Sequence, residues 1–135
     1  MENKIFTYHF TVKEIYLDLF GHMNNATYLT ILEDSRWDLL TQNGFTVADI
    51  QRLGIGPTIL EINIRYLREL RLRDEVVIET KLVSYEKKIG KILQHMKRGE
   101  EVCCTAEFTI ALFDLKQRKI INATPEWLQA LGVST

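Results

Sequence analysis

One stretch of the chain, Asp18-Leu19-Phe20-Gly21-His22-Met23-Asn24-Asn25-Ala26-Thr27-Tyr28, indicates both its fold and its chemistry. It places a carboxylate, a glycine and an imidazole just before a run with the pattern of a helix start, with Asn24 or Asn25 as the N-cap. A helix start offers backbone N–H groups without partners and a partial positive charge. An acid beside such a start suits acyl transfer, in which one group drives attack and another holds the developing oxyanion.

A long helix is predicted from about residue 24 to residue 42, with Gly44 as its stop. Its apolar residues lie on two neighbouring stripes: Tyr28, Leu32 and Leu39 on one, and Leu29, Trp37 and Leu40 on the other. Because these stripes cover much of the circumference, the helix should be largely enclosed by the rest of the fold. Residues 45–57 are predicted to form a loop or a short helical turn.

Alternation of apolar and polar side chains predicts the strands. They are expected at residues 6–12, 60–66, 75–86, 91–97 and 102–112. In the last of them, alternate residues are expected to share one face: Val102, Cys104, Ala106, Phe108, Ile110 and Leu112. A short helix is predicted at 125–131. One long apolar helix with several antiparallel-type strands favours an α+β fold, in which a curved antiparallel sheet wraps around one long central helix.

Length and composition exclude several classes of function. The 135 residues suggest one domain over 1–135, and the formal net charge of -1 gives no general attraction to nucleic acid or to an anionic membrane. No apolar run approaches the roughly 20 residues of a membrane-spanning helix. The N-terminus, Met1-Glu2-Asn3-Lys4, has no signal-peptide pattern, so a cytoplasmic location is expected. Because one helix leaves much of a sheet open, a homodimer is expected.

The cysteines and histidines predict no metal site. Cys103 and Cys104 are neighbours in a predicted strand, so their side chains should point to opposite faces and form neither a disulfide nor a shared metal site. His9, His22 and His95 lack the spacing of metal ligands. We therefore expect no metal and no cofactor.

The residues from Tyr16 to Tyr28, followed by Leu32-Glu33-Asp34-Ser35-Arg36, resemble the signature of hotdog-fold thioesterases. The nearest group is the 4-hydroxybenzoyl-CoA thioesterase-like acyl-CoA thioesterases, whose pattern is an acid, two residues, Gly, often His, a hydrophobe, Asn-Asn and Tyr, with Glu-x-x-Arg on the same helix. A looser likeness extends through 64–68 and 73–75. The resemblance implies the hotdog fold, hydrolysis of an acyl-CoA thioester, and a homo-oligomer that is either a dimer or a dimer of dimers.

The same resemblance implies roles for individual residues. Asp18 aligns with the catalytic acid, and the backbone N–H near Asn25 aligns with the donor that polarises the thioester carbonyl. Asp18 either activates a water or attacks directly, and the sequence leaves both routes open. His22 is either a catalytic helper or a structural hydrogen-bonding group. Gly21 is expected to supply a backbone conformation that other residues resist.

The remaining substrate-binding candidates each have a simpler explanation. The predicted set is Gly21, Asn24, Tyr28, Glu33, Lys87 and Lys88. Asn24 is also expected to cap the helix, Glu33 could form a salt bridge with Arg36, and the two lysines fit either CoA phosphates or a solvated hairpin end. Asp18 itself would fit an Asx-turn.

Two departures from related patterns refine the expected activity. Tyr16 stands where the family often has a second acid. Phe20 stands where plant-type acyl-ACP thioesterases have Asn, which counts against an acyl-ACP substrate. The main alternative is a hotdog protein that binds acyl-CoA without hydrolysing it. A hydratase of the same fold is less favoured, because no hydratase motif is found.

Overall fold

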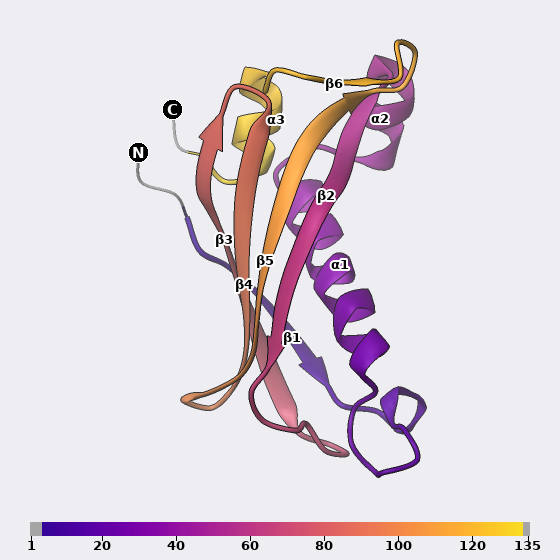
Figure 1. Cartoon of the computed structure of the whole chain (residues 1–135), viewed down its shortest axis with the longest axis vertical. Coiled ribbons are helices and arrows are strands. Elements are labelled where there is room, and N and C mark those ends of the chain that lie inside the picture. Colours follow the sequence, from indigo (N-terminus) through magenta and orange to yellow (C-terminus); the bar gives the residue numbers. More distant parts are fainter. Residues whose placement is uncertain (1–3, 134–135) are drawn as a thin grey trace.

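In the computed structural model, which describes residues 4–133, one antiparallel sheet packs against one long helix (Figure 1). The helices are α1 (Asn25–Gln42), α2 (Val47–Leu53) and α3 (Pro125–Ala130), preceded by a 3-10 turn at Glu14–Tyr16. The strands are β1 (Phe6–Thr11), β2 (Ile55–Tyr66), β3 (Glu75–Glu86), β4 (Ile89–Arg98), β5 (Glu101–Asp114) and β6 (Lys119–Ile121). The predicted α+β hotdog fold is confirmed.

The sheet runs in the order β1-β3-β4-β5-β2, with β6 paired to β5 and every pair antiparallel. β1 and β2 are therefore the two long edges. Figure 1 shows α1 lying along one face of this sheet, with α2 and α3 near the end of the molecule that carries the C-terminal end of α1. The loop that contains Asp18 lies at the opposite end of α1, so the helix spans the length of the sheet.

The predicted alternation in β3 is confirmed, because Val76, Ile78, Thr80 and Leu82 are all buried. They form the core together with the apolar stripes of α1. Within this core Gln94 of β4 is fully buried and joins helix to sheet. Its amide nitrogen donates to the backbone oxygen of Leu32 at 3.2 Å and to the hydroxyl of Thr80 at 3.0 Å. The sheet is thus tied to α1 by polar contacts that fix their relative position.

Arg36 of α1 completes this buried polar group. Its guanidinium donates to the side-chain oxygen of Gln94 at 2.9 Å and lies 4.0 Å from the ring centre of Phe108. Removal from water lowers the pKa of Arg36 to about 10. The Arg36 side chain therefore turns into the fold, and in the described chain no ion pair joins it to Glu33, which is exposed.

One predicted strand pattern is wrong at its start. Val102 does not share the buried face with Cys104, because the register shifts between Met96 and Lys97 and leaves Cys103 as an extra residue in β5. Cys103 and Cys104 are both buried as a result, and neither is in a disulfide. Burial raises the pKa of both thiols. From Cys104 onward the alternate residues are buried as predicted.

The segment 45–57 contains a short helix, α2, rather than a loop. Thr46 caps it by accepting from the backbone N–H of Asp49, while the Asp49 carboxylate accepts from the backbone N–H of Thr46. These hydrogen bonds and Arg52 hold the pKa of Asp49 at about 2. This reciprocal capping box is the local signal that favours helix here.

The edge strand β2 leaves apolar side chains uncovered. Ile62 lies opposite Phe108 in the register, so it points to the face that carries α1. Nevertheless Ile59, Ile62 and Tyr66 keep 37%, 42% and 46% of their surface exposed. α1 packs closest to β3, so the inner face of β2 lacks a full cover within one protomer.

The start of α1 is capped by Asn24. Its side-chain oxygen accepts from the backbone N–H of Ala26 at 2.8 Å, and Asn25 is the first helical residue. Of the two asparagines proposed as the cap, the first is therefore the one that the fold uses.

We expect Asn24→Ala to lower the free energy of unfolding by about 1 kcal/mol, because it removes the cap. Asn25→Ala is the matched control, since its exposed side chain makes no hydrogen bond in the described structure, and a change within about 0.5 kcal/mol is expected. Urea titration of both variants measures the difference. Equal losses of unfolding free energy in the two variants would contradict the assignment of Asn24 as the cap.

Candidate active site

The loop before α1 is a tight turn that exposes Asp18. The backbone N–H of Asp18 donates to the oxygen of His22 at 2.9 Å, and Gly21 donates back to the oxygen of Asp18 at 3.2 Å. Gly21 has φ +85°, a left-handed conformation that side chains with a Cβ resist. The Asp18 carboxylate uses one oxygen, Oδ1, to accept from the backbone N–H of Phe20 at 2.8 Å. Asp18 therefore forms the Asx-turn that the sequence offered as its structural role. The other carboxylate oxygen, Oδ2, takes no part in that turn.

A second segment, residues 66–71, holds this turn in place. Met23 donates to the backbone oxygen of Leu70 at 2.8 Å, and His22 forms an isolated antiparallel bridge with Arg71. Asn24 donates to the oxygen of Tyr16 at 2.8 Å. The turn is thus fixed between the 3-10 turn and the chain that follows β2.

Together the two segments line an open cleft of about 620 Å³ at the start of α1. Of the predicted site residues, the cleft brings together Asp18, His22, Asn24, Asn25 and Tyr28. Gly21 shapes the turn above it. The cleft also contains Phe20 and Tyr66, aromatic residues that could line an acyl site. The sequence did not single out its other lining residues for a role: Leu19, Met23, Leu67, Arg68 and Glu69.

The helix start supplies a free donor to this cleft. No acceptor among residues 4–133 takes the backbone N–H of Asn25, whereas the N–H groups of Asn24 and Ala26 are both occupied. The hydroxyl of Tyr66 donates to the backbone oxygen of Asn25 at 2.9 Å and so steadies this first residue of the helix. A free backbone N–H at a helix start can hold a negatively charged oxygen, because the helix dipole adds to its partial positive charge.

Charged groups converge on His22. Its Nδ1 lies 3.6 Å from Oδ2 of Asp18, and its Nε2 lies 3.5 Å from Oε2 of Glu69. Asp18 and His22 keep 21% and 34% of their side chains exposed, so a ligand in the cleft can reach both. Arg71 hydrogen-bonds the Glu69 carboxylate and holds its pKa below the usual range.

The floor of the cleft is aromatic. Tyr28 is buried, with 3% of its surface exposed, and meets Tyr66 edge to face at a centroid distance of 4.9 Å. Burial raises the pKa of Tyr28 to about 12, so its hydroxyl stays protonated at neutral pH. Tyr28 therefore contributes an apolar wall to the cleft and carries no charge there.

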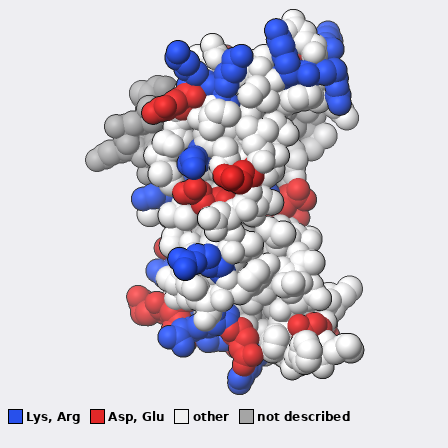
Figure 2. All heavy atoms as spheres, viewed as in Figure 1, with Lys and Arg blue, Asp and Glu red and all other residues white. Residues whose placement is uncertain are grey.

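The predicted lysines lie far from this cleft within one protomer. Lys87 and Lys88 form the turn between β3 and β4, where Lys87 is tied to Ala123 by a backbone hydrogen bond. Figures 1 and 2 show this turn at the opposite end of the molecule from the Asp18 loop, at an end where Lys and Arg side chains gather. One chain does not bring these lysines to Asp18.

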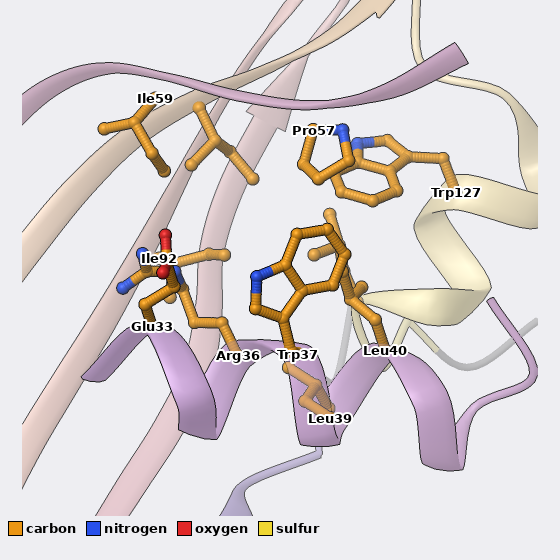
Figure 3. Close-up of a pocket in the computed structure, with 11 residues that line it drawn as sticks. Glu33, Arg36, Trp37, Leu39, Leu40, Pro57, Ile59, Ile92 and Trp127 are labelled. Atoms are coloured by element: carbon orange, nitrogen blue, oxygen red, sulfur yellow. The ribbon is translucent and has the colours of Figure 1, made fainter. Parts of the chain in front are cut away.

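Glu33 belongs to a different, apolar pocket (Figure 3). This pocket lies between α1 and β2 and is lined by Trp37, Ile59, Ile92 and Trp127 among others. Trp37 projects from α1 toward Pro57, while Glu33 and Arg36 lie at one side. Glu33 thus stands on the helix beyond the cleft, not beside Asp18.

Sequence reasoning missed Glu69 because it lies about 50 residues from Asp18 and has the ordinary appearance of a surface charge. The only sequence signal near it was the looser family likeness over 64–68. In residues 4–133 no group of three or more His, Cys, Asp or Glu side chains could hold a metal, and no described helix has the length and hydropathy needed to cross a membrane.

Comparison with known proteins identifies the family. Residues 13–131 match the model of the thioesterase-like superfamily. The chain is 33% identical over 122 residues to the long-chain acyl-CoA thioesterase FadM of Escherichia coli K12, covering 89% of this chain and 92% of that protein. The probable thioesterase YbaW of Escherichia coli superposes with a TM-score of 0.80 at 29% identity, over 93% of this chain and 95% of that one.

A Staphylococcus aureus protein solved in complex with CoA has the same fold, with a TM-score of 0.88 at 21% identity over 96% of this chain and 83% of that one. The matched family, the relatives and the hotdog architecture agree with one another. The chain therefore belongs to the thioesterase-like superfamily, and it is a thioester hydrolase with the hotdog fold.

Proposed function

We propose that this protein hydrolyses acyl-CoA thioesters in the cleft at the start of α1. The observation that carries the proposal is the placement of the Asp18 carboxylate and the free N–H of Asn25 in one cleft. The FadM relative, named as an acyl-CoA thioesterase, and the CoA complex of the Staphylococcus aureus structure support CoA as the thiol.

The reaction follows from this geometry. The thioester oxygen accepts from the Asn25 N–H as negative charge develops on it, and a donor of this kind contributes roughly 3–4 kcal/mol in other hydrolases. Asp18 takes the proton of a water that attacks the carbonyl carbon, or its own oxygen attacks to form a mixed anhydride that water then hydrolyses. In both routes the C–S bond breaks and the CoA thiolate takes up a proton.

The other residues of the cleft have supporting roles. Gly21 gives the turn its shape, Asn24 caps the helix, and Tyr28 forms the wall against which the acyl end lies. His22 contacts Asp18 and orients it. Lys87 and Lys88 stay predicted contacts of the CoA phosphates, and Glu33 stays a predicted contact of the substrate. The cytoplasmic location stays a prediction from the N-terminal sequence.

We expect Asp18→Asn to lower kcat for acyl-CoA hydrolysis by at least about 100-fold, because the amide can neither accept a proton nor attack. Asp34→Asn, at an exposed position on α1, is the matched control and should stay within about twofold of wild type. Release of free thiol measures the rates, and circular dichroism checks the fold. Near wild-type turnover by Asp18→Asn would contradict the assignment. Wild-type binding of acyl-CoA without thiol release would favour the non-hydrolytic alternative.

The acyl group is proposed to be long, and to run from the cleft along α1. Glu33 and Trp37 lie 8 and 12 residues after Asn25, which at about 1.5 Å per residue places the apolar pocket of Figure 3 roughly 12 to 18 Å from the oxyanion donor. The uncovered Ile62 and Ile59 of β2 line the path between them. The relative FadM is named as a long-chain enzyme, which agrees with this path.

A series of acyl-CoAs from acetyl to palmitoyl should therefore show kcat/KM rising with chain length, because each buried methylene contributes about 0.8 kcal/mol. Ile59→Trp, which narrows the path, should reduce kcat/KM for palmitoyl-CoA by at least about 10-fold and leave short substrates unaffected. Leu115→Trp is the control, since Leu115 is similarly exposed (41%) but lies in the turn after β5. Equal rates for all chain lengths would contradict the proposed path.

A homodimer through the β2 edge is proposed to cover the open face. β2 offers an unpaired row of backbone groups over its 12 residues, next to the exposed Ile59, Leu60 and Ile62. An isologous pair of these edges satisfies both the hydrogen bonds and the apolar surface. Two such dimers joined through other sheet surfaces would give the predicted dimer of dimers.

Light scattering should give at least twice the chain mass of 15.8 kDa. Ile62→Glu should shift the protein toward the monomer, because it places a charge in the proposed interface. Val83→Glu is the matched control, since Val83 is 47% exposed on β3 against 42% for Ile62. A monomeric wild-type protein, or an Ile62→Glu variant with unchanged mass, would contradict the β2 interface.

A further inference from the structure

Glu69 is a second carboxylate in the cleft, and the proposed reaction gives it no role. It comes from the segment after β2 and reaches the side of His22 that faces away from Asp18. The imidazole therefore lies between two carboxylates, with Asp18 at Nδ1 and Glu69 at Nε2. In catalytic triads a carboxylate orients a histidine that contacts the reacting residue, and Glu69, His22 and Asp18 make contacts in the same order.

The fold holds Glu69 firmly. Its backbone oxygen accepts from Arg98 at 3.1 Å, and its carboxylate accepts from Nε of Arg71 at 3.1 Å and from the neighbouring Nη2. Arg98 is itself fixed by Asp74 at 2.8 Å. The backbone bridge between Arg71 and His22 joins this cluster directly to the loop of Asp18. Both the main chain and the carboxylate of Glu69, whose side chain is 44% exposed, thus have hydrogen-bond partners before a substrate arrives.

The contacts to His22 are at 3.5 and 3.6 Å, slightly longer than hydrogen bonds. Catalytic hydrogen bonds in ligand-free sites are often long and shorten in the substrate complex. Each ring nitrogen faces a carboxylate oxygen, which accepts hydrogen bonds, so an N–H at either nitrogen has an acceptor beside it. Without Glu69 the ring keeps its contacts with Asp18 and with the stacked ring of Phe20, whose centroid lies 6.0 Å away, but loses its contact at Nε2.

We propose that Glu69 is a positioning residue of the thioesterase site: it holds the imidazole of His22, and through it the Oδ2 oxygen of Asp18, in the orientation that the reaction needs. This inference rests on the proposed function. It also gives His22 one role among those that the sequence left open, namely to transmit the position of Glu69 to Asp18.

If Glu69 only stabilised the arginine cluster, removing another carboxylate of that cluster should have the same effect on activity. Glu101 is the matched control for this comparison. Glu101 lies in the same arginine cluster, where it pairs with Arg68 and Arg98, but it does not contact His22. Loss of the Glu101 carboxylate therefore disturbs the cluster without releasing the imidazole. Because Glu69 also lines the cleft and pairs with Arg71, a His22→Gln background is needed to separate an effect that passes through His22 from a direct one.

The kinetic test is a double-mutant cycle on the full-length protein with a good acyl-CoA substrate. We expect Glu69→Gln to lower kcat roughly 10-fold with little change in KM, and Glu101→Gln to stay within about twofold of wild type. In a His22→Gln background, adding Glu69→Gln should lower kcat by less than a further factor of about two, because the imidazole through which Glu69 acts has been removed. The same 10-fold loss in both backgrounds, or no loss in the wild-type background, would overturn the proposal.

A second measurement needs no turnover. In nitrogen–proton correlation spectra of the imidazole rings, with the His22 signals assigned by their absence in His22→Gln, we expect the Nε2 resonance of His22 to move in Glu69→Gln and to stay in place in Glu101→Gln. An unmoved resonance would overturn the positioning role. If wild-type protein hydrolysed no acyl-CoA, the proposed function would fail, and these spectra would still decide whether Glu69 holds His22.

Discussion

The position of α1 on the sheet is the constraint on which the rest of the structure depends. Gln94 bonds the backbone of Leu32 from within the core and accepts from Arg36, so the helix is fixed along its axis as well as against the sheet. Apolar packing alone tolerates sliding, whereas a buried hydrogen bond has a defined geometry and is costly to break. The start of the helix is fixed in addition by the hydrogen bonds of Met23 to Leu70 and of Asn24 to Tyr16.

The cleft is built where that fixed helix meets two loops. The turn at Asp18 brings a carboxylate to the helix start, and the chain after β2 brings Tyr66 to the same place. The Asn25 N–H is free because Asn24 caps its neighbour instead. One asparagine therefore satisfies the helix while the next presents a donor. Helix capping and the proposed oxyanion binding are compatible because they use different N–H groups.

Features of the fold could be predicted from the sequence where the pattern that indicates them lies within a short stretch of chain. A cap at Asn24 or Asn25 and a long helix follow from short-range patterns, and the alternation in β3 follows from a period of two. The helix is less enclosed than predicted, because Thr30, Glu33 and Asp34 are among its exposed residues. The bulge at Cys103 does not, because it depends on the register with β4. The α+β fold was predictable because long periodic segments dominate it. The roles of Asp18, His22 and Asn25 stay predictions.

The arrangement of the site residues was less predictable than the fold. Asp18, His22 and Asn25 lie within 8 positions of one another, so a local motif contained them. Glu69 reaches them only through the pairing of distant segments, and nothing in its neighbours distinguishes it from other exposed charges. Lys87 and Lys88 illustrate the reverse case, since a cluster of charge on a turn was visible although the fold places it at the far end of the protomer.

The bulge in β5 determines when, during synthesis and folding, the cleft can be completed. The carbonyl of Cys103 accepts the N–H groups of Leu67 and Arg68 at 2.9 and 3.1 Å, and so anchors the segment that completes the cleft. During synthesis the Asp18 loop and α1 leave the ribosome long before β5 does. Long-range strand pairing is also the slow part of folding. The cleft can therefore be completed only after β5 has docked, and not when the helix first forms.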